Sequence, residues 1–278
     1  MNQIAYLGPE GTFGHEAAKI WSPNASYVAF RSHLHILDAV EKGDVADGIV
    51  AIENSIDGPV TDVIDYFIHD ALRTRVCGEI VVPINQCLFA KPGVSLENVR
   101  MVISHSKGLG QCAKSIHRQF PTAQQVEVDS TAAAVIKMLA VNVPMVAVAI
   151  AGKPAIKPGA VILQENFQDV KNNATRFWVV GQKITKPTGQ DKTSLVFEIF
   201  KNAPGALLSI YAIFASRGLN LSKIESRPTK EVLGAYVFLA DVEAHQADPV
   251  LRDALRMVRI CTPKLKVFGS YPRWQNGL

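Results

Sequence analysis

The stretch IAYLGPEGTFGHEAAKIW, residues 4–21, sets the pattern on which the fold depends. Its first four residues are apolar and predict a short buried strand, and GPEGTF is a turn that contains glycine and threonine. Ala17, Ala18 and Trp21 then fall on one face of a helix. A strand followed by a tight turn and a helix is the repeating unit of α/β proteins, so we expect an α/β fold.

The same alternation continues up to residue 180. Further strands are expected at 48–52, 80–82, 99–103, 126–128, 146–150 and 177–180, with helices from Thr61, over 112–120 and over 131–139. The run 48–52 contains no polar side chain, which is typical of a strand buried on both faces. This part of the chain therefore predicts a domain with largely parallel sheets.

A different pattern follows the polar segment QKITKPTGQDK, residues 182–192. The segment contains proline and glycine and lacks hydrophobic periodicity, which indicates a linker. Beyond it we expect a strand at 194–200, a helix at 206–216 that stops near Gly218, strands at 220–227 and 232–240, a helix at 250–258 and a strand near 264–268. The order βαββαβ predicts a ferredoxin-like sandwich, giving domains at 1–182 and 193–270 joined by 183–192.

Composition excludes several classes of protein. The 278 residues suffice for roughly two domains of about 150 residues each. Hydrophobic residues make up 48% and charged residues 19%, which argues against disorder and coiled coil. The net charge of +4 is scattered, so we expect no nucleic-acid partner. No run of apolar residues is long enough for a membrane span and the start does not resemble a signal peptide, so no membrane partner is expected.

The four cysteines, Cys77, Cys87, Cys112 and Cys261, are far apart and form no C-x-x-C pair. This spacing supports neither a zinc site nor a disulfide framework. Reduced thiols in a cytoplasmic protein fit the pattern best, and no metal is expected.

Four loops stand where an expected strand ends and a helix begins: GPEGTF (8–13), IENSIDGPV (52–60), SHSKGLGQC (104–112) and DSTAAA (129–134). Ligands of open α/β sheets bind beyond the carboxyl ends of the strands, where helix N-termini offer free N–H groups to anions. The four loops together therefore predict a crevice for a small ligand with several negative charges.

Each loop taken alone also fits a structural role. GPEGTF lacks the Gly-Lys-Ser/Thr ending of a nucleotide-binding P-loop and fits a simple turn. The stretches 53–55 and 130–131 fit helix or turn caps, His105 fits a structural histidine, and Arg176 in NNATRFWVV (172–180) fits a surface ion pair.

The motifs in combination are more informative. GPEGTF, E-N-S-x-x-G-x-V, S-H-x-x-x-L-x-Q-C, S-T-A-A-A and N-x-T-R-F occur in this order, followed by G-A-L at 205–207 and E-S-R-P at 225–228. Over about residues 3–270 the chain closely resembles the monofunctional prephenate dehydratases, which carry a C-terminal ACT regulatory domain. Two departures concern loop geometry: Ser106 and Gly108 replace the family's usual Pro and Ala, and Pro154 and Pro158 stand where relatives have an Ala-rich helix.

The resemblance implies a two-lobed catalytic domain similar to periplasmic binding proteins, with lobes at about 1–80 with 165–181 and at 83–164. It implies a lyase of L-phenylalanine and aromatic amino acid biosynthesis that converts prephenate to phenylpyruvate without a cofactor. Allosteric feedback by L-phenylalanine and a cytoplasmic homodimer or homotetramer are further implications. Arogenate as substrate and a non-catalytic sensor of small anions and amino acids are the alternatives. The complete set of site residues disfavours the sensor.

The resemblance also assigns residues. Thr175 is expected beside the leaving hydroxyl as a hydrogen-bond donor, with Glu53, Asn54, Ser104 and Gln111 as the other catalytic candidates. Arg176 is expected to bind a substrate carboxylate and Phe177 to wall the pocket, with Thr12, Ser55 and Thr131 as further substrate contacts. The effector site is expected at Gly205, Ala206, Leu207, Leu208, Asn220, Glu225, Ser226, Arg227 and Pro228. The alternative for this unit is a dimerisation module without a ligand.

Overall fold

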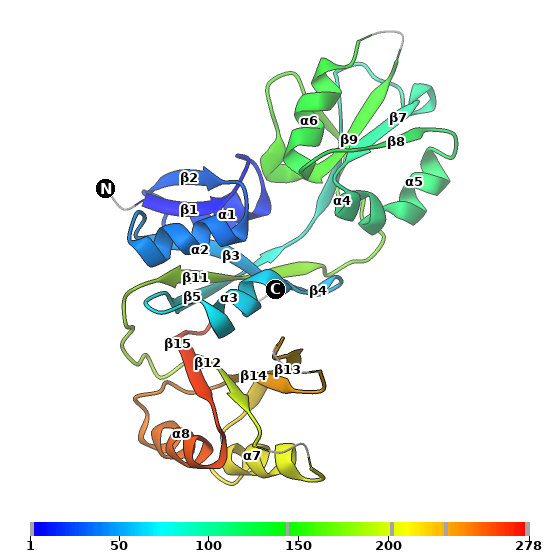
Figure 1. Cartoon of the computed structure of the whole chain (residues 1–278). Coiled ribbons are helices and arrows are strands. Elements are labelled where there is room, and N and C mark those ends of the chain that lie inside the picture. Colours follow the sequence, from blue (N-terminus) through cyan, green and yellow to red (C-terminus); the bar gives the residue numbers. More distant parts are fainter. Residues whose placement is uncertain (1–2, 143–144, 201–202, 231–232, 276–278) are drawn as a thin grey trace.

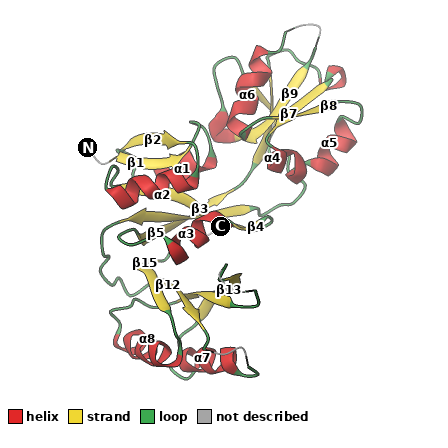
Figure 2. Ribbon diagram, in the orientation of Figure 1, coloured by secondary structure: helices red, strands yellow, loops and turns green. Residues whose placement is uncertain are grey.

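The structure is a computed structural model and describes residues 3–142, 145–200, 203–230 and 233–275. Over these residues the chain forms three β-sheets covered by helices (Figure 1, Figure 2). The first two sheets form two lobes, and the third belongs to a C-terminal unit on the far side of the first lobe from the second (Figure 1). The expected α/β architecture, two lobes followed by a βαββαβ unit, is confirmed.

The sheet of the first lobe has the strand order β2-β1-β3-β11-β5, and β4 pairs with β3. Its strands are β1 (Gln3–Leu7), β2 (Ser26–Phe30), β3 (Asp47–Asn54), β4 (Gly58–Pro59), β5 (Arg75–Pro83) and β11 (Ala174–Gly181). β1 is parallel to β2 and β3, whereas β11 is antiparallel to β3 and β5. The expectation of largely parallel sheets is wrong, because both lobes have mixed sheets: β11 is antiparallel to its neighbours in the first lobe, and β6 (Gln86–Ala90) is antiparallel to its neighbours in the second.

Helices cover both faces of this sheet: α1 (Phe13–Trp21) on one face, α2 (His33–Lys42) and α3 (Thr61–His69) on the other. Successive side chains of a strand point to opposite faces. Accordingly Phe177 of β11 packs in the core beneath α1, and Trp178 packs in the core of α2 and α3. The same alternation places Thr175 on the α1 side and Arg176 on the opposite side.

The second lobe has the strand order β10-β6-β9-β7-β8. Its strands are β6 (Gln86–Ala90), β7 (Met101–Ser104), β8 (Gln124–Glu127), β9 (Ala147–Gly152) and β10 (Val161–Gln164), and its helices are η1 (Leu96–Asn98), α4 (Ser106–Gln111), α5 (Ala113–Gln119), α6 (Thr131–Ala140) and η2 (Lys153–Ala155). Pro154 lies in the first turn of η2, where the missing N–H leaves no hydrogen bond unmade. A short turn thus occupies the segment in which the two prolines exclude a longer helix.

The C-terminal unit has the strand order β13-β14-β12-β15. It comprises β12 (Asp191–Glu198), α7 (Ala206–Ala215), β13 (Leu221–Pro228), β14 (Tyr236–Val242), α8 (Pro249–Cys261) and β15 (Leu265–Pro272). β12 begins two residues inside the expected linker, and Asp191 accepts hydrogen bonds from the backbone N–H groups of Thr188 and Gly189 there. The strand expected at 232–240 begins at Tyr236, and its first expected residue lies outside the described residues.

The sheet of the C-terminal unit lies between two layers. Its helices cover one face, and Val196, Leu239 and Phe268 on the other face share a core with Phe67 and Trp178 of the first lobe. At Gly269, a Cβ atom would collide with the backbone of Val76, so β15 and β5 approach each other directly. The C-terminal unit is therefore packed against the sheet that carries Thr175. Within the described ranges, every helix is too short or too polar to cross a bilayer.

Candidate functional site

Asn54 and Thr175 form the centre of the candidate site, where the ends of β3 and β11 pair. Asn54 Nδ2 donates to Thr175 Oγ1 at 2.9 Å, and Asn54 Oδ1 accepts from the backbone N–H groups of Ile56 and Asp57. Asn54 thus caps the following turn, which is the structural role that its sequence also fits, and it holds the Thr175 hydroxyl in place. Because Thr175 Oγ1 accepts from Asn54, its own proton remains available to a ligand.

Gln111 brings the second lobe to this turn. Its Nε2 donates to Asp57 Oδ2 at 3.1 Å, and its Oε1 accepts from Gln86 Nε2 at 3.2 Å. Gln111 is the last residue of α4, whereas Asp57 follows β3 of the first lobe. The expected catalytic candidates Asn54, Thr175 and Gln111 are therefore close together although they come from two lobes.

Asn173 is a further residue of this site, to which sequence analysis assigned no role. Its Oδ1 accepts from Asn54 Nδ2 at 2.8 Å and from the hydroxyl of Ser55 at 3.4 Å. The residue is 2% exposed, and among the described residues its Nδ2 has no hydrogen-bond partner. A buried donor without a partner beside Asn54 and Thr175 is suited to a ligand oxygen. In the sequence, Asn173 is the first residue of the N-x-T-R-F motif, and this position was the signal that could have identified it.

The hydroxyl candidates of the other loops hold local structure. Thr12 caps α1, because its Oγ1 accepts from the N–H of His15 at 3.3 Å and donates to a strand carbonyl at 2.9 Å. Ser104 is fully buried, and its hydroxyl donates to the carbonyl of Ile150 at 2.7 Å. Ser130 caps α6, which places Thr131 in its first turn, near Gly108.

His105 has a structural role as well. It is the N-cap of α4, and its Nδ1 accepts from the N–H of Lys107 at 3.2 Å. The imidazole therefore holds the start of this helix, as the structural interpretation of the sequence suggested.

The GPEGTF loop contacts the second lobe directly. A Cβ atom at Gly152 would lie 2.5 Å from Cζ of Phe13, so the ring rests on the glycine. A Cβ at Gly11 would lie 3.0 Å from the carbonyl oxygen of Pro154. Only small residues permit this approach, so the structure has the two lobes in direct contact at the GPEGTF loop.

Replacing Gly152 with alanine should therefore keep the lobes apart. The backbone angles of Gly152 (φ −65°, ψ 152°) suit alanine, and the atoms nearest to the new methyl group all belong to the ring of Phe13. We expect kcat/KM to fall by about 10- to 100-fold, because reacting groups from two lobes are misplaced. The matched control is Gly110→Ala, since a Cβ there meets no atom within 4 Å. Equal steady-state kinetics for both variants would refute the closing role of this contact.

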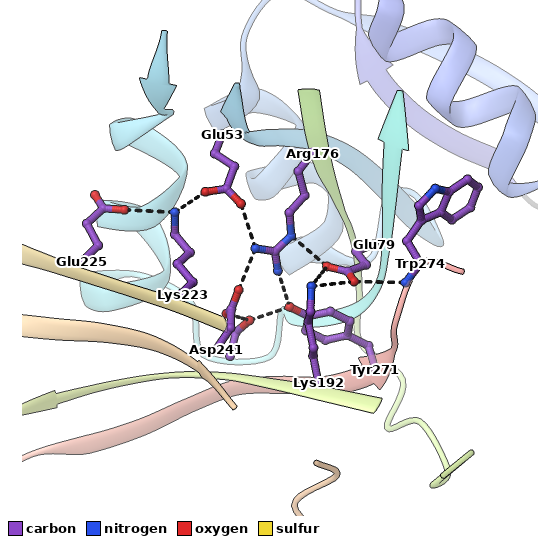
Figure 3. A network of polar contacts seen from close by, with 10 residues as sticks. Glu53, Glu79, Arg176, Lys192, Lys223, Glu225, Asp241, Tyr271 and Trp274 are labelled. Carbon is purple, nitrogen blue, oxygen red and sulfur yellow. Dashed lines mark hydrogen bonds and ion pairs between the residues drawn. The ribbon is translucent and has the colours of Figure 1, made fainter. Parts of the chain in front are cut away.

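Arg176 lies on the opposite face of β11 from Thr175, in contact with the C-terminal unit (Figure 3). Its Nε donates to Glu79 Oε2 at 2.8 Å, its Nη1 to Asp241 Oδ2 at 2.6 Å and its Nη2 to Tyr271 Oη at 2.9 Å. The side chain is 9% exposed, so the ion pairs are buried and not at the surface. This arrangement does not support the expected role of Arg176 as a substrate anchor.

Glu53 also turns away from Thr175. Its Oε1 accepts from Arg176 Nη1 at 3.0 Å, and its Oε2 pairs with Lys223 of β13. Burial alone would raise the pKa of Glu53, but hydrogen bonds and charge from Lys223 and Arg176 outweigh it and hold the pKa below its ordinary value. The carboxylate is therefore ionised at neutral pH and is no proton donor.

The expected effector residues divide between two faces of β13. Glu225 and Arg227 face the first lobe, where Arg227 Nη2 pairs with Asp65 Oδ1 of α3 at 2.9 Å. Ser226 and Pro228 are exposed on the other face. Asn220 is exposed just before β13, and Gly205, with φ of +81°, precedes α7, whose first residues are Ala206, Leu207 and Leu208.

Thiols do not contribute a nucleophile to the site. Cys77, Cys87 and Cys112 are buried, and burial raises the pKa of Cys77 to about 11 and of Cys112 to about 12. Cys261 is exposed at the end of α8, in the C-terminal unit and on the far side of the first lobe from the second (Figure 1). In the part of the chain that the structure describes, no three His, Cys, Asp or Glu side chains gather as a metal site.

Comparison with known proteins decides the family. A family model for prephenate dehydratase matches residues 4–185, and one for the ACT domain matches residues 193–258. The chain belongs to the prephenate dehydratase family. Prephenate dehydratases are lyases that convert prephenate to phenylpyruvate, and this is the activity of the family to which the chain belongs.

Three similar proteins illustrate the match. A bifunctional chorismate mutase/prephenate dehydratase of Aquifex aeolicus is 37% identical, over 98% of this chain and 74% of that protein. A prephenate dehydratase of Bacillus subtilis is 33% identical, over 98% of this chain and 99% of that protein. The crystal structure of a prephenate dehydratase from Arthrobacter aurescens in complex with L-Phe has a TM-score of 0.87 at 34% identity, covering 98% of this chain and 90% of that one.

Proposed function

We propose that the cleft between the two lobes dehydrates and decarboxylates prephenate, with Thr175 as the donor to the leaving hydroxyl. The hydrogen bond from Asn54 Nδ2 to Thr175 Oγ1 carries this assignment. It occupies a lone pair of the threonine oxygen and directs the hydroxyl proton elsewhere. Asn173 and Gln111 supply further amide donors beside it.

The electrons of the reaction are balanced within the substrate, whereas the one proton that the reaction consumes comes from the solvent. The bond from the ring to its carboxylate breaks and releases carbon dioxide, while the electron pair of that bond enters the ring. The ring becomes aromatic as its carbon–oxygen bond breaks, and the departing oxygen leaves as water after taking up a proton. An alkyl hydroxyl is too weak an acid to give up its proton unaided, so Thr175 stabilises the departing oxygen by a hydrogen bond.

We propose that L-phenylalanine regulates the enzyme at its ACT domain. The L-Phe complex of the Arthrobacter relative supports this assignment. The start of α7 and the exposed face of β13 are the candidates for the binding site, where Leu208 is 69% exposed and Ile224 52% exposed. Such apolar exposure favours pairing of ACT domains, so we propose a homodimer or homotetramer. A cytoplasmic location suits a biosynthetic enzyme whose four cysteines are all free thiols.

Phenylpyruvate formation by the purified chain tests these assignments. We expect turnover of prephenate, suppressed by L-phenylalanine, with arogenate measured in parallel. Turnover of arogenate alone would identify arogenate, and not prephenate, as the substrate. The Asn54–Thr175 geometry is compatible with either, because nothing in it distinguishes a keto from an amino side chain. Absence of turnover with either substrate, from folded protein, would favour the sensor alternative.

A further inference from the structure

The buried charge network around Arg176 joins the two domains (Figure 3). We call it the Arg176 network; its members are Glu53, Glu79 and Arg176 of the catalytic domain and Lys192, Lys223, Asp241 and Tyr271 of the ACT domain. Three carboxylates face three cations, which offsets the cost of removing these charges from water. Each domain supplies both positive and negative side chains. The network is therefore complete only when the domains are docked as they are here.

One end of the network reaches the catalytic centre through the backbone. Glu53 directly precedes Asn54, and Arg176 directly follows Thr175. The two pairs lie opposite each other in the β3–β11 register, Arg176 with Glu53 and Thr175 with Asn54. The register shifts immediately after Arg176, so this short ladder is separated from the rest of the strand pairing. Each charged side chain is therefore one residue away from a partner in the Asn54–Thr175 hydrogen bond.

The other end reaches β13, the strand that carries the E-S-R-P motif. Lys223 Nζ pairs with Glu53 Oε2 and lies 3.4 Å from Glu225 Oε2. Side chains along β13 alternate, so Lys223 faces the catalytic domain while Ser226 is exposed on the opposite face. A ligand on the exposed face would displace the strand, and Lys223 would carry that displacement to Glu53.

We propose that the Arg176 network, through Lys223 and Glu53, transmits the state of β13 to Thr175 and Asn54. Arg176 is then a positioning residue: it touches no substrate and acts through its neighbour in β11. The inference rests on the proposed regulation by L-phenylalanine and names the path by which the two sites are linked. Linkage of this kind is reciprocal, so the effector and the substrate site alter each other's binding equally.

Lys223→Met tests the path because it removes the contact of β13 with Glu53 and leaves Arg176 paired with its other partners. Typical allosteric coupling changes affinity by about 5- to 150-fold. We expect the variant to bind L-phenylalanine as the unaltered chain does, by calorimetry, while this coupling factor falls to near one. Basal turnover should persist and thereby report a folded enzyme. Lys223→Arg, which keeps the charge, should retain the coupling.

The matched control is Lys230→Met. Lys230 also crosses the domain interface, but it pairs with Asp65 of α3 at 2.6 Å and forms no ion pair with Glu53. This variant should keep the full response to L-phenylalanine. Unaltered coupling in Lys223→Met would overturn the inference, and so would its loss of L-phenylalanine binding or of basal turnover. An unaltered chain that ignores L-phenylalanine would instead refute the proposed regulation.

Discussion

Replacing Thr175 with alanine is expected to lower kcat by about 10²- to 10³-fold, the usual cost of one lost donor to developing charge. The side chain is small, and among the residues that the structure describes its only hydrogen bond comes from Asn54 Nδ2, so the fold should tolerate the change. KM should change little, because the hydroxyl is needed most as the carbon–oxygen bond breaks. Steady-state kinetics with prephenate measure both quantities.

Thr175→Ser is the matched control for this prediction. Serine keeps the hydroxyl and its hydrogen bond with Asn54 but loses the methyl group, so most of the activity should remain. If instead Thr175→Ala raised KM and left kcat intact, Thr175 would be a binding residue, and the donor to the leaving oxygen would have to be sought elsewhere. Asn173 would be the next candidate, because its buried Nδ2 lacks a partner among the described residues.

Replacing Arg176 with methionine is expected to lower the free energy of unfolding by about 3–5 kcal/mol, as when one partner of a buried ion pair is removed. The loss leaves Asp241, which is fully buried, and Glu79, which is 4% exposed, facing each other without the guanidinium. Lys192 still pairs with Glu79 at 2.9 Å and limits the damage on that side. Urea denaturation followed by tryptophan fluorescence measures the change.

Arg217→Met controls for the loss of a cation. Arg217 pairs with Asp253 at 2.8 Å on the outer surface of the ACT domain, and breaking such an exposed pair should cost about 0–1 kcal/mol. For Arg176→Met, a large rise in KM with an unaltered free energy of unfolding would restore the role expected from sequence, a guanidinium that binds a substrate carboxylate.

Local sequence was sufficient for most elements and for the family. The strand, turn and helix of residues 4–21 follow from apolar periodicity and a capping threonine, and the βαββαβ order follows from the same signals. Some elements were not among those expected although signals exist. α2 begins after Ser32, which caps it, and ends at Gly43 in the left-handed region, two marks of helix ends.

The direction of β11 and the partners of its side chains depended on tertiary structure. Residues 172–180 predict a strand, and strand periodicity places Thr175 and Arg176 on opposite faces. Periodicity cannot say which face meets the ligand when both faces are buried, because the answer depends on where the ACT domain docks. Similarly, Lys223 meets Glu53 across 170 residues of sequence. The sequence thus determined most of the elements, the family and the residues at the start of β11, whereas domain docking decided that Thr175 pairs with Asn54 and that Arg176 faces the domain interface.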